Sequence, residues 1–373
     1  MATAKIFEAT VDHFLAPILP FMQDESVSEI MINSPDEIYI EKAGRLIRTE
    51  ARFEDEEALL SAVNNVLQYT GKRLTPEQPL IDSRLPDGSR VHVILAPLSR
   101  RGTCMSIRKF AKNLFTADTF TEMGTWSDPA REYLEICVSA EKNLLVSGGT
   151  SSGKTCLLNV LSSFIPGHQR IVVIEDSSEL ELQQDHLISL ESRPPDRWGK
   201  GEVGIADLFR SSLRLRPDRI IIGEVRGGEA LDMIQAMTSG HAGSMSTLHA
   251  NMPLDAMNRL ETLAMMNEVE LPLHALRAQI SSAIDLVVQM TRFSDGRRSV
   301  TQISEVLPLG DDGKYRLQDI FRYDLNDGEG GDGQGSLAWT GATSEFAPEP
   351  KIRILRPKWE LTKPIFQSDV TTA

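Results

Sequence analysis

Residues 143–155 read Asn-Leu-Leu-Val-Ser-Gly-Gly-Thr-Ser-Ser-Gly-Lys-Thr, and this stretch decides the fold. It opens with an apolar run, beginning at Leu144, that is typical of a buried strand. The pattern G-x-x-x-x-G-K-[ST] follows from Gly148 to Thr155, and residues 156–165 then carry apolar side chains at helical spacing. A strand, a glycine loop and a helix in this order predict a phosphate-binding loop.

The residue types of this loop suit the chemistry of phosphate binding. Its glycines let the backbone turn tightly and aim N–H groups at phosphate oxygens, and the helix N-terminus adds a partial positive charge. Lys154 is expected to reach the outer phosphates, and the Thr155 hydroxyl is expected to ligate Mg²⁺. An ordinary glycine-rich turn would explain the glycines but not the Lys-Thr pair before a helix. The expected binding set is Gly148, Gly149, Thr150, Ser151, Ser152, Gly153, Lys154 and Thr155.

Strands and helices are expected to alternate on both sides of the loop, which predicts an α/β domain with a parallel-rich sheet. The expected strands are 143–147, 170–175, 187–190, 219–223, 245–248 and 284–291. The expected helices are 153–165, 204–215, 227–239, 254–266 and 272–282, with another at 128–139 ahead of the loop. Ligands of such sheets bind beyond the carboxyl ends of the strands, so the site is expected there.

The rest of the chain predicts a smaller domain, a linker and a tail. Short alternating runs and one helix at 55–69 give residues 1–111 an α+β pattern, beginning with an antiparallel meander. Residues 112–128 have no clear period and are interpreted as a linker, which leaves 129–325 for the domain that carries the phosphate loop. A glycine-rich, acidic loop spans residues 324–335, and residues 336–373 contain four prolines, so a flexible or loosely packed tail is expected over 326–373.

Composition excludes several classes of protein. The 373 residues carry a net charge of −14, which argues against an electrostatic nucleic-acid binder. No apolar run approaches the length of about 18 residues that indicates a transmembrane helix, and the N-terminus lacks a signal-peptide pattern. The three cysteines are scattered, which implies no disulfide framework and suits a reducing cytoplasm.

Three polar residues that could do chemistry follow apolar runs in the predicted sheet. Glu175 follows Arg-Ile-Val-Val-Ile, Glu224 follows Ile-Ile-Ile-Gly, and His249 follows Ser-Met-Ser-Thr-Leu. Next to a phosphate loop, such residues could hold Mg²⁺, orient an attacking water and sense the terminal phosphate. Each alone has a structural alternative, because acidic residues at strand ends often cap helices and a lone histidine is more often structural. Their conjunction with the phosphate loop favours the catalytic interpretation.

At this point the chain resembles the type II/type IV secretion ATPases, and within them the CpaF-like branch that serves tight-adherence pili. The resemblance covers roughly residues 25–325. Its most specific pieces are Leu-Pro-Asp-Gly-Ser-Arg (85–90), the phosphate loop (148–155), Arg-Leu-Arg-Pro-Asp-Arg-Ile-Ile-Ile-Gly-Glu-Val-Arg-Gly (214–227) and Gly-His-Ala-Gly-Ser-Met-Ser-Thr-Leu-His-Ala-Asn (240–251).

The resemblance implies a RecA-like P-loop ATPase domain behind a smaller, PAS-like N-terminal domain. It implies that Glu175 lies in an acidic box and could contact Mg²⁺, and that Glu224 polarises water. His249, with His241 upstream, would belong to a histidine box. Arg90 and Arg108 would be directed at the nucleotide by the N-terminal domain. Many phosphate-loop enzymes have an aspartate for Mg²⁺ at the position of Gly223. The resemblance implies that the secretion family, like this chain, lacks that aspartate.

The implied protein is a cytoplasmic ATPase that uses ATP and Mg²⁺ and assembles into a ring, expected to be a hexamer. It would act at the inner membrane through platform proteins of a pilus or secretion machine, without binding nucleic acid directly. Two alternatives stay open. One is a conjugation or type IV secretion ATPase, and the other is a nucleotide-gated regulatory or scaffold protein with little hydrolysis. Intact Lys154 and Glu224 weigh against the second.

Overall fold

The structure is a computed structural model that describes residues 10, 13–42, 44–75, 78–109, 115–195, 199–324 and 335–367. The chain divides into two compact units, residues 1–114 with 294–297 and residues 115–293 with 298–373. Each unit has its own hydrophobic core and is described by itself. In the parts of the chain that the structure describes, no helix is both long enough and apolar enough to cross a membrane.

The N-terminal unit is a six-stranded sheet with the order β3-β2-β1-β6-β5-β4, and its neighbouring strands are antiparallel. The expected meander is confirmed as β1 to β3. Alternate residues of β1 and β2, such as Ile30 and Ile38, are buried against the apolar face of α3. Asp55 caps the N-terminus of α3, because its side chain accepts a 2.8 Å hydrogen bond from the Ala58 N–H. The elements are η1 (Ala16–Ile18), α2 (Leu19–Gln23), β1 (Val27–Ser34), β2 (Glu37–Lys42), β3 (Arg45–Arg48), α3 (Glu56–Tyr69), β4 (Leu80–Arg84), β5 (Arg90–Ile94) and β6 (Cys104–Arg108).

The C-terminal unit is built on a nine-stranded sheet with the order β15-β14-β13-β12-β7-β11-β10-β8-β9. The strands from β12 to β9 are parallel, as the sequence predicts, and β13, β14 and β15 extend the sheet in antiparallel fashion. Its strands are β7 (Leu144–Gly148), β8 (Ile171–Glu175), β9 (Leu187–Glu191), β10 (Arg219–Ile222), β11 (Met245–His249), β12 (Leu286–Arg292), β13 (Arg298–Leu307), β14 (Arg316–Asp324) and β15 (Ser336–Trp339).

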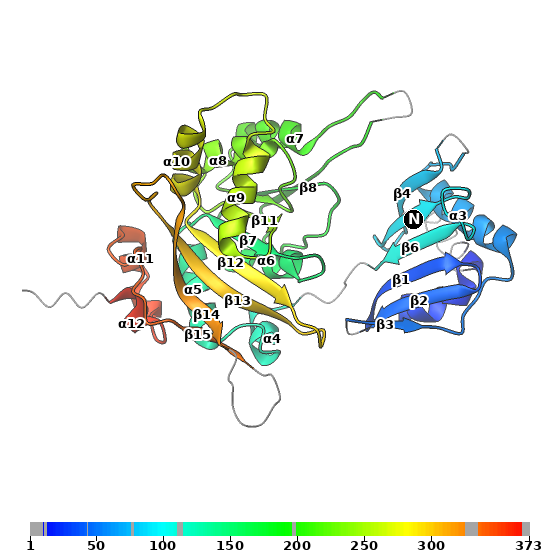
Figure 1. Ribbon diagram of the computed structural model, residues 1–373, viewed down its shortest axis with the longest axis horizontal. Coiled ribbons are helices and arrows are strands. Elements are labelled where there is room, and N and C mark those ends of the chain that lie inside the picture. The colour runs from blue at the N-terminus through cyan, green and yellow to red at the C-terminus, as the bar shows by residue number, and fades with distance from the viewer. Residues whose placement is uncertain are drawn as a thin grey trace, which may run out of the picture. The chain divides into compact units, whose positions relative to one another are not determined.

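Helices cover both faces of this sheet (Figure 1). Alternate residues of the central strands point to opposite faces, so Leu144 and Val146 belong to one core cluster while Leu145 belongs to the other. One face packs against α5 (Asp128–Ser139) and α6 (Lys154–Ser162), and the other packs against α7 (Ile205–Ser212), α8 (Glu229–Thr238), α9 (Pro253–Ala264) and α10 (Leu273–Ala283). The short helix η2 (Leu213–Leu215) follows α7.

The prediction of a flexible tail is wrong for residues 336–367. After β15, this segment forms α11 (Pro350–Ile354), η3 (Arg356–Lys358) and α12 (Lys363–Phe366), which lie beside α5 and β14 (Figure 1). The ring of Phe366 stacks between Tyr133 and Trp359, with centroid separations of 5.5 and 4.7 Å. Buried Glu305 accepts hydrogen bonds of 2.5 Å from the Tyr133 and Ser344 hydroxyls, which ties the segment to β13. The expected flexible, glycine-rich loop is 324–335, and its residues 325–334 lie outside the described residues.

The predicted linker is also part of the C-terminal unit from residue 115 onward. Residues 115–128 contain α4 (Ala117–Glu122), whose Thr116 cap accepts a 3.1 Å hydrogen bond from the Thr119 N–H. Phe120 meets Trp126 edge to face at 5.4 Å, and both rings are buried in the core cluster that includes α5. The aromatic residues therefore hold this segment, although it has no helical period. Residues 112–114 of the predicted linker lie outside the described residues.

Candidate active site

The strand order brings the carboxyl ends of the relevant strands to one edge of the sheet. The phosphate-loop strand β7 lies beside β11, and His249 at the end of β11 pairs with Gly148 at the end of β7. On the other side of β11 lies β10, which leads into Glu224, and β8 ends at Glu175 beyond it. The predicted catalytic residues of this unit and the phosphate loop therefore share the edge expected for a ligand.

The backbone of the phosphate loop requires glycine at two positions. Gly153, just before α6, has a φ of 96°, a backbone conformation that residues with a Cβ adopt rarely. At Gly148, a Cβ would lie 2.6 Å from the Met290 carbonyl oxygen and would collide with the Ser152 hydroxyl, whereas at Gly149 it would meet nothing within 4 Å. The loop is thus packed against β12 on one side and open on the other.

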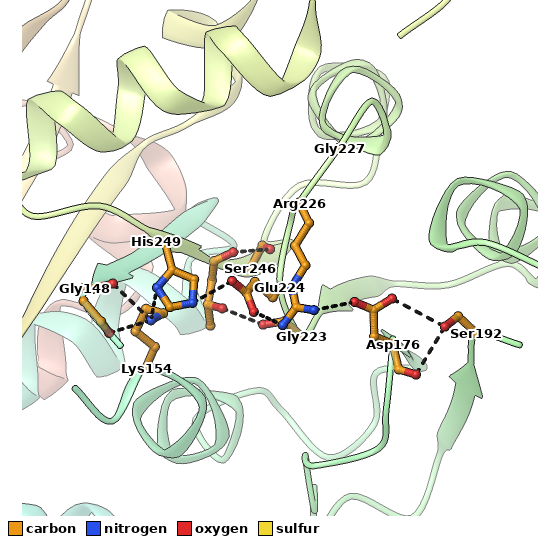
Figure 2. A network of polar contacts seen from close by, with 12 residues as sticks. Gly148, Lys154, Asp176, Ser192, Gly223, Glu224, Arg226, Gly227, Ser246 and His249 are labelled. Atoms are coloured by element: carbon orange, nitrogen blue, oxygen red, sulfur yellow. Dashed lines mark hydrogen bonds and ion pairs between the residues drawn. The ribbon is translucent and has the colours of Figure 1, made fainter. Parts of the chain in front are cut away.

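Lys154 lies at the centre of this edge although it is only 7% exposed. Its ammonium group donates hydrogen bonds to the carbonyl oxygens of Gly148, at 3.0 Å, and Gly149, at 2.9 Å, and lies 3.3 Å from Nδ1 of His249 (Figure 2). A buried ammonium group needs such partners, because burial without them would disfavour its charge. The loop carbonyls therefore hold the ammonium group at the carboxyl edge of the sheet. Its contact with the outer phosphates of a nucleotide stays a prediction.

His249 connects Lys154 to Glu224. An ammonium group has no lone pair, so Nδ1 of the imidazole accepts the contact from Lys154, and Nε2 must carry the proton that is donated to Glu224 at 2.9 Å. Burial lowers the pKa of His249 below its ordinary value, and the positive charge of Lys154 lowers it further. Both effects favour the neutral imidazole that this pair of contacts requires.

The carboxylate of Glu224 is also held on its other side. Its Oε2 accepts a 2.6 Å hydrogen bond from Nη2 of Arg226, and Nη1 of the same guanidinium lies 3.1 Å from Oδ2 of Asp176. Figure 2 shows the resulting row of side chains from Lys154 through His249, Glu224 and Arg226 to Asp176. The sequence places the Asp176 carboxylate beside Glu175 at the end of an apolar run and Arg226 two positions after Glu224, but it predicted no role for either residue.

Gly223 has a structural reason to lack a side chain. A Cβ at this position would lie 2.9 Å from Cγ of Glu175, so an aspartate could not stand here without displacing that side chain. The Gly223 carbonyl oxygen also accepts a 2.6 Å hydrogen bond from the Thr247 hydroxyl of β11. The glycine thus leaves room for the Glu175 side chain beside the end of β10.

Glu175 has a structural role that the sequence did not reveal. It is buried, and its Oε1 accepts hydrogen bonds from the N–H groups of Glu179, at 2.9 Å, and Leu180, at 3.0 Å. The carboxylate therefore holds the loop that follows β8. Its predicted catalytic and metal-binding roles stay predictions.

The other predicted residues take the following places. Thr155 is the second residue of α6 and is partly buried, while Thr150 and Ser151 are exposed and Ser152 is buried. Arg90 and Arg108 face each other across β5 and β6 of the N-terminal unit, so the structure brings these two together in that unit. Their predicted role toward the nucleotide stays a prediction. His241 precedes β11 and His249 ends it, so the two histidines lie toward opposite ends of that strand.

Arg298 is another residue near the loop that the sequence did not predict. Its Nε donates a 2.9 Å hydrogen bond to the Ser151 carbonyl oxygen from the start of β13. The two residues are 147 positions apart, so only the pairing of β13 with β12, next to β7, brings them together. No local motif could have indicated this contact.

No protein cluster for a metal is found within the described ranges: no three or more His, Cys, Asp or Glu side chains are placed to hold an ion together. Mg²⁺ in nucleotide sites usually takes one or two protein ligands and completes its shell with phosphates and water. Thr155 as a ligand is consistent with this pattern, and the assignment stays a prediction.

The parallel sheet, the phosphate loop and the glutamate–histidine pair at the same edge define a P-loop ATPase fold. The sequence matches the family described as "Type II/IV secretion system protein" over residues 12–310, and the chain belongs to this family. The match ends before β14 and leaves out the segment from β14 to α12.

Curated relatives agree with this assignment, and a solved structure has a similar fold. The type IV secretion system protein PtlH of Bordetella pertussis is 34% identical over 327 residues, covering 79% of this chain and 95% of PtlH. The conjugal transfer protein TrbB of Rhizobium radiobacter is 31% identical over 282 residues, covering 74% of this chain and 83% of TrbB. The ATPase DotB of Legionella pneumophila has a similar fold, with a TM-score of 0.55 at 19% identity over 83% of this chain and 80% of DotB. These matches do not distinguish the CpaF-like branch, which stays a prediction.

Proposed function

We propose that this chain hydrolyses ATP to ADP and phosphate and converts the reaction into mechanical work for a secretion or pilus machine. The observation that carries the proposal is the contact of Glu224 with His249, and of His249 with Lys154, directly beside the open side of the phosphate loop. Membership of the secretion family supports the same activity.

ATP with Mg²⁺ fits the residues present. The open side of the loop at Gly149 leaves room for phosphates, and Lys154 would exchange the loop carbonyls for the outer phosphate oxygens. Thr155 would ligate Mg²⁺, with Glu175 as a second candidate. When bound, the ion would neutralise the charge that develops on the phosphates.

Glu224 is the best candidate to orient and deprotonate the attacking water. It is 18% exposed, so solvent can reach the carboxylate, and its orientation is set by His249 on one oxygen and Arg226 on the other. His249 in its neutral form would link the phosphate-binding lysine to this carboxylate. The reaction is therefore phosphoryl transfer to water, and these residues would catalyse it by positioning the water and by electrostatic stabilisation.

We further propose that the working form is a ring, expected to be a hexamer, at the cytoplasmic face of the inner membrane. Platform proteins of the machine would provide the membrane contact, and no direct binding to nucleic acid is expected from the net charge of −14. The motif resemblance favours assembly of a tight-adherence pilus. The names of PtlH and TrbB favour type IV secretion or conjugation as the second candidate.

The activity is tested with the purified full chain, by equilibrium titration with a fluorescent ATP analogue and by phosphate release with Mg²⁺ and ATP. Lys154→Ala is expected to weaken nucleotide binding at least about tenfold, since a hydrogen bond to a charged group contributes about 1.5–3 kcal/mol. Lys314→Ala is the matched control, because Lys314 is 77% exposed and pairs with Asp312, two positions away. Unchanged affinity in the Lys154 variant would refute the nucleotide site.

The choice between machines is tested in the source organism with Lys154→Ala at the chromosomal locus. Loss of surface pili with normal conjugal transfer and normal protein secretion supports the pilus assignment. Normal pili together with loss of transfer or secretion would contradict it and favour the second candidate.

A further inference from the structure

The carboxylate of Glu224 is held by two side chains that approach from opposite sides (Figure 2). His249 donates to Oε1 at 2.9 Å, and Arg226 donates to Oε2 at 2.6 Å. A glutamate side chain has several rotatable bonds, so one contact alone would leave the plane of the carboxylate free to turn. Two contacts on different oxygens fix that plane.

Arg226 is itself held in place. Its backbone N–H and that of Gly227 both donate to Oε1 of Glu229, at 2.7 and 2.9 Å, so the turn after Glu224 is closed by the first residue of α8. At the other end of the side chain, Nη1 lies 3.1 Å from Oδ2 of Asp176. The hydrogen bond to Glu224 also raises the pKa of Arg226, so the guanidinium keeps its charge.

Asp176 in turn is connected to the loop that follows β9. The hydroxyl of Ser192 donates to the Asp176 carbonyl oxygen at 3.2 Å and to its Oδ1 at 3.4 Å. The row of contacts therefore runs from the end of β9 to the carboxylate of Glu224. This part of the row contains no residue of the phosphate loop, which is reached only beyond Glu224, through the contact of His249 with Lys154.

We propose that Arg226 is a positioning residue for Glu224 and that Asp176 acts by orienting the Arg226 guanidinium. The inference rests on the proposed function, in which Glu224 activates water. The planar fork of an arginine can give one N–H group to each of two separate carboxylates, and a lysine ammonium is a compact point charge without this geometry. Arg226 therefore sets the orientation of the carboxylate, and Lys154 binds the phosphates without its help.

This division of roles separates turnover from binding. Loss of the Arg226 contact frees Glu224 to rotate, and a misplacement of about 1 Å in a catalytic group can cost about 100-fold in rate. Arg226→Gln should lower kcat about 10- to 100-fold and change the dissociation constant for ATP less than twofold. Arg226→Lys should recover part of kcat, because it keeps the charge and one donor. Asp176→Asn should have a smaller effect in the same direction.

The experiment measures kcat, KM and equilibrium ATP-analogue binding for the full chain and these three variants, with thermal unfolding on each preparation. Arg210→Gln is the matched control, because Arg210 is 64% exposed and lies 3.8 Å from Asp207 within one helix. The expected result is a loss of kcat in Arg226→Gln that Arg210→Gln does not show. In the Arg226→Gln background, Asp176→Asn should have no further effect.

Three results would overturn the inference. The first is a kcat of Arg226→Gln within twofold of wild type. The second is a parallel loss of ATP binding, which would place Arg226 on the nucleotide itself. The third is an additive effect of Asp176→Asn in the double variant. The variant Glu224→Gln separates failure of this inference from failure of the proposed function. If Glu224→Gln turns over ATP at the wild-type rate, the proposed function is refuted. If Glu224→Gln abolishes turnover, only the role of Arg226 is in question.

Discussion

At the scale of single residues, the protonation state of His249 decides whether the contacts from Lys154 to Glu224 are complete. A neutral imidazole accepts from Lys154 at Nδ1 and donates to Glu224 from Nε2.

His249 provides a prediction about pH. Its pKa is lowered by burial and by Lys154, so the imidazole is expected to stay neutral from high pH down to below about 6.5, the ordinary value for histidine. Protonation at lower pH removes the acceptor for Lys154 and should lower kcat. The free energy of unfolding should depend on pH in the same direction. The neutral histidine contributes to it above about pH 6.5, and this contribution is lost as pH falls toward the lowered pKa of the folded state.

The measurement is kcat between pH 5 and 8 for wild type and His249→Gln, whose amide does not titrate in this range. Wild type should show an acid limb with a midpoint below about pH 6.5 that is absent from the variant. An identical acid limb in both proteins would assign it to another group.

The sequence predicted the groups at the sheet edge but few of their partners. Lys154, Glu224 and His249 lie together as expected. An acidic residue at the end of a strand can be a catalytic group or a cap, and only the structure shows that Glu175 accepts hydrogen bonds from the loop that follows it. Arg226 stands two positions after Glu224, yet nothing in the sequence indicated which carboxylate it would contact.

At the scale of elements, the sequence predicted the regular part of the fold well. The strands from β7 to β12 and the helices between them lie within a few residues of their expected positions, because strongly apolar strands and amphipathic helices alternate there. The segments at 115–128 and 336–367 were missed because a few aromatic residues hold them to the core by long-range contacts. Such packing produces no period in the sequence.

The packing of the tail is tested by Phe366→Ala. Phe366 is 4% exposed and stacks on Tyr133 and Trp359, so its removal should lower the free energy of unfolding by about 3–5 kcal/mol, as for other buried aromatic residues. Leu361→Ala is the control, because Leu361 is 51% exposed. Equilibrium unfolding in urea measures both. If the two variants unfold at the same urea concentration as wild type, the segment does not stabilise the C-terminal unit.

At the scale of the whole molecule, the prediction concerns the contribution of the N-terminal unit to catalysis. Arg90 and Arg108 lie opposite each other on β5 and β6, which concentrates two positive groups on one part of that sheet. If they meet the charge that develops on the terminal phosphate, each is worth about 10³- to 10⁵-fold in rate. If they are surface ion-pair partners, each contributes about 0–1 kcal/mol of stability and nothing to the rate.

Arg90→Ala and Arg108→Ala should therefore reduce ATP turnover severely and leave thermal unfolding nearly unchanged. Arg101→Ala is a control in the same unit, since Arg101 is 76% exposed and pairs with Glu37. Turnover should be measured at protein concentrations high enough for a ring to assemble. Near-normal rates in both variants would remove these arginines from the mechanism and leave the C-terminal unit as the complete site.

The central claim is that Glu224 activates water for ATP hydrolysis beside the phosphate loop. The most direct test measures ATP binding and phosphate release on the same preparation of wild type and Glu224→Gln. The amide keeps the shape of the side chain and can still accept a hydrogen bond, but it cannot take the proton from water. The account predicts ATP affinity close to wild type and phosphate release reduced to background. Phosphate release near the wild-type rate in Glu224→Gln would contradict it.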